Sequence, residues 1–266
     1  MTPEELLHQG DPEAAMAALQ ERVRAKPNDV RTRVFLFQLL CVLGQWDRAK
    51  NQLKVLAELD AAQLAMVDLY APALSCEQLR EEVFAGKRTP LILGEPLPWL
   101  ALLIEALAME SRGAYAEAVQ TRSVALEQAV AIAGNIDSTA FEWIADADPR
   151  LGPVCEVIVD GQYYWLPFER IQLLLIDKPQ DLRDVVWMPA QLRLTNGAEI
   201  VALIPARYPG SETNADGAIR LARKTVWSEA HPECYFGHGQ RLFATDQGEY
   251  PLVGTARIEL NHASRA

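Results

Sequence analysis

The spacing of apolar residues changes near residue 150. Before it, apolar positions recur with the period of a helix, and two stretches are apolar on nearly every side, which favours helices buried between neighbours. These stretches are RTRVFLFQLLCVL (31–43) and WLALLIEALAM (99–109). After Pro153 the period becomes two, and turn dipeptides separate the apolar runs. The pattern predicts a helical N-terminal half followed by a β-rich C-terminal half.

The helical half contains an internal repeat. Gly10 and Gly44, each of which precedes a predicted helix, lie 34 residues apart, and a small residue follows each by five positions, at Ala15 and Ala49. A third copy begins at Gly113. This period and these small residues indicate tetratricopeptide-like helix pairs. The two clearest copies are GDPEAAMAALQERVRAKPND (10–29) and GQWDRAKNQLKVLAELDAAQ (44–63).

Helical arrays of this kind often present a surface that binds a peptide or a helix, although some serve only as scaffolds. The repeat here is degenerate, because residues 62–95 predict one long helix followed by KRTPLILGEPLP, which fits no repeat unit. The pattern favours partner binding over a plain scaffold.

The β-rich half is punctuated by turn signals. Asp-Gly and Asn-Gly readily adopt the positive φ angles of short hairpin turns. We therefore expect hairpins in CEVIV-DG-QYYWLPF, in VVWMPAQLRL-TNG-AEIVALIPA and in QRLFAT-DQGE-YPLVGTARIEL, with a helical turn near 214–222 and a strand at 224–227. Five or six short strands would form a small, partly open barrel or a rolled sheet.

The predicted fold class is thus α+β with two domains. The tetratricopeptide-like array covers residues 1–138, the β-rich domain covers 139–266, and residues 139–153 form the junction between them.

Composition narrows the classes of function. The chain of 266 residues carries a formal charge of −11, and its longest run of basic residues is two, so it lacks the clustered cations that bind nucleic acid or an anionic membrane. Acidic residues occupy the N-terminus where a signal peptide needs positive charge, and no apolar run is long enough to span a bilayer. We expect a soluble cytoplasmic protein. Cys41, Cys76, Cys155 and Cys234 are far apart and read as buried free thiols.

The segment FEWIADADPRLGP (141–153) is the first candidate for chemistry. Its acids Glu142, Asp146 and Asp148 could serve a metal-dependent hydrolase. The chain has no phosphate-binding Gly-rich loop, no P-loop lysine and no nucleophile elbow to support that alternative. We favour a structural role, in which the acids and Arg150 tie the helical half to the first strand.

A second candidate is the string HPECYFGH, in which His231, Cys234 and His238 have residue types that bind zinc or copper. A fourth ligand is missing, and the string lies in a loop between two predicted strands. We therefore expect no metal, although a metal-binding module stays an alternative. The polar loop YPGSETNADG (208–217) is either functional or a turn that its own side chains satisfy.

Several long strings resemble one protein family in the same order along the chain. They are FLFQLLCVLGQWDRA (35–49), VFAGKRTPLILGEPLPWLALL (83–103), FEWIADADPRLGPVCEVIVDGQYYWLPFERI (141–171) and ARYPGSE (206–212). In these strings the chain resembles the ImpE/TagJ family, also called SciE-type.

The resemblance implies an accessory protein of the bacterial type VI secretion system. It implies that the protein contacts the sheath subunit TssB through the N-terminal helix of TssB. It also implies a link to the AAA+ ATPase ClpV, which disassembles the contracted sheath. The family supplies no catalytic residues and no cofactor, so we expect a non-enzymatic adaptor. The candidate partner surface or domain junction comprises Glu142, Trp143, Asp146, Asp148, Arg150, Arg207, Tyr208, Ser211 and Glu212.

Overall fold

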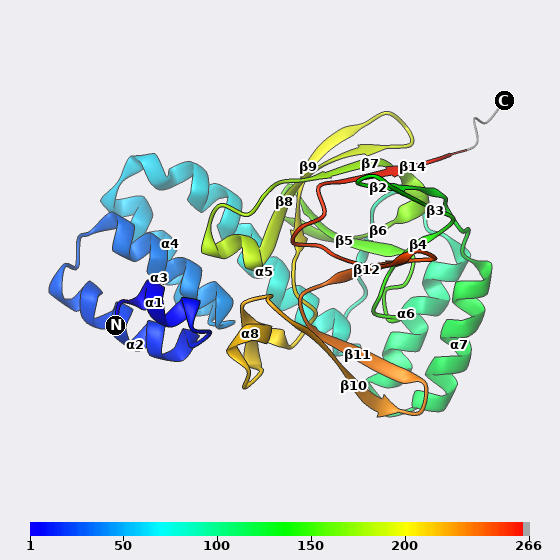
Figure 1. Cartoon of the computed structure of the whole chain (residues 1–266), viewed down its shortest axis with the longest axis horizontal. Helices are drawn as coiled ribbons and strands as arrows, with labels where there is room; N and C mark the ends of the chain where they lie inside the picture. Colours follow the sequence, from blue (N-terminus) through cyan, green and yellow to red (C-terminus); the bar gives the residue numbers. More distant parts are fainter. Residues whose placement is uncertain (263–266) are drawn as a thin grey trace.

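The structure is a computed structural model that describes residues 1–262, so the last four residues of the predicted β-rich range lie outside the described part. Helices α1 to α4 and the first part of α5 form one end of the molecule, and α6 and α7 lie at the other end beside the sheet (Figure 1). The helices are α1 Pro3–His8, α2 Pro12–Ala25, α3 Val30–Val42, α4 Trp46–Leu59, α5 Leu64–Phe84, α6 Pro98–Glu110, α7 Tyr115–Gln128 and α8 Gly217–Arg220, with 3₁₀ turns η1 Ala61–Gln63, η2 Phe168–Arg170, η3 Leu182–Val185 and η4 Ser211–Thr213.

The repeat glycines lie in the turns that join paired helices. Gly10 connects α1 to α2, Gly44 connects α3 to α4 and Gly113 connects α6 to α7, with φ angles of 83°, 64° and 78°. Glycine adopts this left-handed conformation without the strain that a Cβ would cause. Ala15 and Ala49 are fully buried where the second helix of each pair packs on the first. The predicted helix–turn–helix units are confirmed.

The second half is built on an open nine-stranded sheet with the order β1-β6-β5-β9-β8-β7-β14-β2-β3. A two-stranded sheet, β10-β11, and a three-stranded sheet, β13-β12-β4, accompany it. The strands are β1 Leu91–Ile92, β2 Gly134–Ile136, β3 Thr139–Phe141, β4 Ile144–Asp146, β5 Val154–Val159, β6 Gln162–Pro167, β7 Ile171–Ile176, β8 Trp187–Leu194, β9 Glu199–Pro205, β10 Thr225–His231, β11 Cys234–Gly239, β12 Leu242–Thr245, β13 Gly248–Pro251 and β14 Arg257–Leu260.

The three predicted hairpins are present as β5-β6, β8-β9 and β12-β13. Asp160 and Gly161 both have positive φ, which matches the right-handed twist of β5 and β6. The predicted helical turn is α8, and the strand after it is β10. The α+β class and its order, helices before sheet, are confirmed.

Three expectations were wrong in detail. The C-terminal half has more strands than five or six, because strands of three or four residues such as β4 are too short to show alternation. Two short strands lie in the range that the pattern assigned to helices, residues 1–138: β1, which pairs in parallel with β6, and β2, which pairs with β14. His231 and Cys234 belong to strands β10 and β11 and flank a tight turn, not a longer loop.

One of the two hydrophobic cores is shared by both halves, and the other lies among the strands of the C-terminal half. Trp187 at the start of β8 packs between Tyr70 of α5 and Trp46 of α4, with ring centroids 5.8 and 6.1 Å away. The same cluster of buried side chains extends from α1 to β6 and β9. The division at residue 138 therefore stays a prediction. Within the described residues, the helices are too short or too polar to cross a membrane, and the four cysteines are free and buried.

Candidate functional site

The acids of the 141–153 segment lie inside the protein. Asp146, the last residue of β4, accepts a hydrogen bond from Arg241 Nη1 at 2.5 Å and one from the Asp148 backbone at 2.8 Å. Its side chain is almost completely buried, as is that of Arg241. Burial raises the pKa of Asp146 to about 7, although the Arg241 guanidinium opposes that shift.

Asp148 forms a buried ion pair with Arg150, and a backbone N–H also donates to its carboxylate. Its carboxylate accepts from Arg150 Nε at 2.9 Å, from Arg150 Nη2 at 2.5 Å and from the Gly237 backbone N–H at 2.9 Å. Burial alone would raise the pKa of Asp148, but Arg150 and the backbone donors outweigh it and lower the pKa. The Arg150 guanidinium lies over the rings of Phe84 and Phe236, at 5.1 and 4.3 Å, so the pair links α5, the junction segment and β11.

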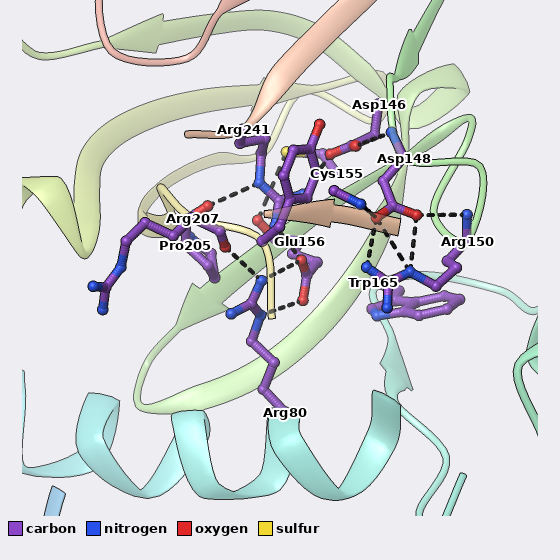
Figure 2. Close-up of polar contacts among 12 residues, drawn as sticks. Arg80, Asp146, Asp148, Arg150, Cys155, Glu156, Trp165, Pro205, Arg207 and Arg241 are labelled. Carbon is purple, nitrogen blue, oxygen red and sulfur yellow. Dashed lines mark hydrogen bonds and ion pairs between the residues drawn. The ribbon is translucent and has the colours of Figure 1, made fainter. Parts of the chain in front are cut away.

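Glu156 in the middle of β5 is the centre of the network (Figure 2). Arg80 of α5 donates to both of its oxygens, from Nε at 2.7 Å and from Nη2 at 3.0 Å. Arg241 and the Tyr163 hydroxyl also donate to it. Burial would raise the pKa of Glu156, but Arg80 and Arg241 outweigh burial and lower the pKa to about 2. Glu156 is therefore an ionised carboxylate held between two buried guanidinium groups.

Arg207 ties the loop after β9 to the helical array. Its Nη1 donates to the carbonyl of Val42 at 2.7 Å and its Nη2 to that of Cys41 at 3.3 Å, at the C-terminal end of α3. Carbonyls at a helix C-terminus lack partners within the helix and carry partial negative charge, so an arginine satisfies both needs. The Arg207 carbonyl accepts from Arg80 Nη2 at 2.8 Å, which connects this contact to the Glu156 network.

The rest of the ARYPGSE string packs around the same place. The Tyr208 hydroxyl accepts from the Leu242 backbone at 3.0 Å. The Ser211 hydroxyl donates to the Tyr208 carbonyl at 2.5 Å and accepts from the Gly239 backbone at 2.7 Å. Glu212, which is partly buried, lies against Gly44, where an added Cβ would come within 2.4 Å of its side chain.

Two of the nine candidate residues lie outside this cluster. Glu142 and Trp143 are exposed at the surface, and the contact that positions Glu142 is its backbone N–H, which donates to Asp246 at 2.7 Å. The other seven are buried or partly buried where helices, sheet and the β10-β11 hairpin meet.

This geometry gives little support to the chemical alternatives. The carboxylates of Asp146 and Asp148 form ion pairs with arginines and are buried away from solvent, so a metal ion or a substrate has no access to them. His231 stacks on Tyr115, Cys234 is in contact with Glu110, and His238 pairs with Ser228. These three side chains have separate partners, and among residues 1–262 no group of three or more metal-ligating side chains is assembled.

Comparison with known proteins places the chain in a family. The family model described as "ImpE protein" matches residues 138–259. The type VI secretion system accessory component TagJ of Pseudomonas aeruginosa is 51% identical over 97% of this chain and 91% of its own length. The chain belongs to the ImpE/TagJ family. The resemblance noted in the sequence is thereby confirmed.

Two further similarities concern the fold of this ImpE/TagJ member. A tetratricopeptide repeat model matches residues 6–71, which span α1 to the start of α5. A crystal structure of a Vibrio parahaemolyticus protein superimposes with a TM-score of 0.91 at 23% identity, over 98% of both chains. At that identity the likeness shows the fold alone.

Sequence reasoning missed three central residues of this ImpE/TagJ chain. Arg80, Glu156 and Arg241 were not among the candidates, although each is buried in the network. One signal was available at Glu156, which interrupts the apolar run VCEVIV. A charged residue in the middle of a buried strand requires a partner. The partner itself lies 76 positions away and has no local signature.

Proposed function

We propose that this chain is a non-enzymatic accessory protein of a type VI secretion system and acts as an adaptor. The observation that carries the proposal is the 51% identity, over nearly the whole chain, to the protein named as the accessory component TagJ. The repeat-like helices support it, because arrays of paired helices commonly bind other proteins.

The proposed partner is the sheath subunit TssB, recognised through its N-terminal amphipathic helix, with a link to the ClpV ATPase. Both names come from the family resemblance. Laying the apolar face of a helix on an array of helices is an established mode of recognition. The protein would act in the cytoplasm.

The buried network is proposed as the junction that sets the two halves relative to each other. Seven of the candidate residues, Asp146, Asp148, Arg150, Arg207, Tyr208, Ser211 and Glu212, would serve that role together with Arg80, Glu156 and Arg241. Glu212 packs against Gly44, and the polar groups of the other nine residues are paired with one another and with backbone atoms, which is typical of a structural network. Glu142 and Trp143 are exposed and would be free to contact a partner.

Calorimetry of the full chain with a synthetic peptide of the TssB N-terminus tests the proposal. We expect binding with modest affinity that changes weakly with salt, because burial of apolar area would supply most of the free energy. A peptide of the same composition in scrambled order is the control. If high micromolar peptide produces neither a binding heat nor a change in the tryptophan fluorescence of the chain, binding to TssB is refuted.

The link to ClpV needs a separate measurement. Purified ClpV is passed over immobilised chain, alone and after the chain has been loaded with TssB. Retention in either arm supports the link and distinguishes direct contact from contact through TssB. If ClpV is not retained in either experiment, the link to ClpV is refuted.

A further inference from the structure

The outer strand of the β10-β11 hairpin, at the lower edge of the molecule in Figure 1, differs from the other edge strands. The nine-stranded sheet ends in β1 and β3, which have two and three residues, and the three-stranded sheet ends in β13 and β4, which have four and three. β10, by contrast, has seven residues and pairs with β11 along one side. Short edge strands limit the unpaired backbone that another chain could reach. Among the strands described, β10 therefore presents the longest edge.

The register of the hairpin shows which backbone groups of β10 point outward. The Gln240 N–H donates to the Lys224 carbonyl at 3.0 Å, directly before the first residue pair of the ladder. Hydrogen-bonded and non-hydrogen-bonded pairs alternate along an antiparallel ladder, so the next even-numbered residues of β10 bond to β11. The residues whose N–H and C=O groups point away from β11 are then Thr225, Trp227 and Glu229.

The two edges of this hairpin differ in whether their outward groups are paired. On β11, the Gly237 N–H donates to Asp148 Oδ2 at 2.9 Å, and the Gly239 N–H donates to Ser211 Oγ at 2.7 Å. On β10, the outward N–H and C=O groups have no hydrogen-bond partner within residues 1–262. A row of unpaired backbone groups is a template for a further strand, so this edge is open to another chain.

β10 also lacks the features that usually protect an edge. Lysine and proline are common protective residues, as are bulges that turn the edge away. The stretch from Thr225 to Glu229 contains neither lysine nor proline, and its register with β11 becomes irregular only beyond Glu229. Trp227 in its middle packs on Tyr208, with ring centroids 5.5 Å apart, and is still 38% exposed. Because tryptophan is enriched at protein interfaces, this regular and accessible edge is a candidate contact surface.

The charges along the hairpin make this edge complementary to itself. Lys224, at the base, has a half-exposed side chain that forms a surface pair with Asp216 at 3.3 Å. Glu229 and Glu233, near the tip, are exposed. In an antiparallel pair of β10 strands, the acidic tip of each hairpin lies towards the basic base of the other, whereas a parallel pair would place like charges together. Opposite charges across an interface favour the encounter and the correct register.

We infer that β10 pairs in antiparallel orientation with β10 of a second copy of this chain and so forms a symmetric dimer. The two hairpins then make one four-stranded sheet with the order β11-β10-β10-β11. A two-fold axis requires a surface that is complementary to itself, as this edge is. A four-stranded sheet is also more stable than a two-stranded ribbon. Because the contact is one strand wide, the dimer belongs to the class of weak interfaces. A dimer of this kind does not depend on the proposed adaptor role.

Self-association of the full chain is the first measurement. In sedimentation velocity from low to high micromolar concentration, the average mass should rise from 29.6 kDa towards twice that value. Amide hydrogen exchange, followed by NMR over the same concentrations, identifies the contact. The outward amides of Thr225, Trp227 and Glu229 should gain protection as the dimer forms, because they acquire carbonyl partners. The amides of Val226 and Ser228 already bond to β11 and should change little.

Two variants block the edge in different ways. Trp227→Pro removes an outward N–H and leaves the hydrogen bonds to β11 in place, as proline does on natural edge strands. Ser228→Lys, at an exposed position, brings two like charges together across the two-fold axis. We expect both variants to sediment as monomers at every concentration. Val201→Lys, at a position on β9 that is 71% exposed, is the matched control and should dimerise as the wild type does.

Circular dichroism and the melting temperature verify that each variant folds, and Ser228→Lys decides alone if proline at Trp227 disrupts the hairpin. Loss of the dimer in Ser228→Lys, together with new protection at the outward amides of β10 in the wild type, supports the strand pairing. A wild type that stays monomeric up to high micromolar concentration overturns it. A dimer that persists in Ser228→Lys, or that forms while the outward amides still exchange freely, lies on another surface and overturns it as well.

Discussion

Arg80 on α5 and Glu156 on β5 form a buried two-point ion pair across the boundary between helices and sheet, with N–O distances of 2.7 and 3.0 Å. Both side chains are almost completely excluded from solvent. Such a pair adds little net stability by itself, because desolvating two charges costs about as much as their attraction returns. Removal of one partner is a different matter, since it leaves the other charge buried without compensation.

Replacing Glu156 by Gln should therefore destabilise the protein strongly. Among carboxylates, Arg80 would keep only its longer contact with Glu77, at 3.4 Å, and Arg241 only its pair with Asp146. Because both buried guanidinium groups lose their main carboxylate, the free energy of unfolding should fall by about 3 kcal/mol. Denaturant unfolding followed by tryptophan fluorescence measures the change. Glu142→Gln, at an exposed acid outside the network, is the matched control and should alter stability by about 0.5 kcal/mol or less. Equal midpoints for the two variants would show that the pair does not hold the halves together.

The same carboxylate predicts an acid transition. The pKa of Glu156 is lowered to about 2 in the folded protein, below its ordinary value of 4.5. A carboxyl group whose pKa is lowered by folding stabilises the folded protein at pH values above its pKa in the unfolded protein. This stabilisation is lost as the pH falls from about 4.5 towards 2. The stability gap between wild type and Glu156→Gln should accordingly narrow between pH 6 and pH 3. A gap that stays constant over this range would contradict the ionised state of Glu156.

Asp148 and Asp146 should differ in their tolerance of substitution. Asp148→Asn deprives Arg150 of the carboxylate it contacts, so the free energy of unfolding should fall by about 3 kcal/mol or more. Asp146→Asn leaves Arg241 paired with Glu156, and the amide oxygen can still accept from the Asp148 backbone. The free energy of unfolding of Asp146→Asn should therefore fall by only about 1–2 kcal/mol. Thermal unfolding at one pH ranks the two variants, and the reverse order would be inconsistent with this division of the network.

The pH dependence of the Asp146 variant should run opposite to that of Glu156. Burial raises the folded-state pKa of Asp146 to about 7. A raised pKa means that folding favours the protonated carboxyl. The resulting stabilisation of the folded protein is complete when the pH is below the pKa in the unfolded protein, about 3.8, and is lost as the pH rises through 7. The stability gap between wild type and Asp146→Asn should be largest at about pH 4 or below and should shrink as the pH rises through 7. Parallel titration of both variants by denaturant unfolding provides the check.

Local features of the fold could be predicted from the sequence, because their causes lie within a few residues. Gly10 and Gly44 marked helix–helix turns through the need for positive φ, and Asp160-Gly161 marked a hairpin in the same way. Seven of the nine candidate residues also lie together in the structure, because the family resemblance carried strings whose residues meet in space.

The connections between distant segments could not be predicted. β4 pairs with β12, about a hundred residues further along, and three residues are too few to show a period of two. Arg80 looks like an ordinary surface residue of a helix until the fold places Glu156 opposite it. The covering of the array by Trp187 and Arg183 is likewise a tertiary effect, so the expected ligand-binding face of a repeat array was filled from within the chain.

The turn at Gly44 offers a test of how closely the two halves fit. Gly44 has a φ of 64°, and an added Cβ would come within 2.4 Å of the Glu212 side chain, whereas Gly10, at a φ of 83°, has open space around the same position. Valine at either site should cost about 1 kcal/mol or more, because a β-branched residue is disfavoured at positive φ. Gly44→Val should cost more than Gly10→Val, since Glu212 must also move away from α3. The difference between the two melting temperatures isolates that contact. If Gly10→Val proves equally destabilising, backbone strain alone explains both, and Glu212 is not packed tightly against the array.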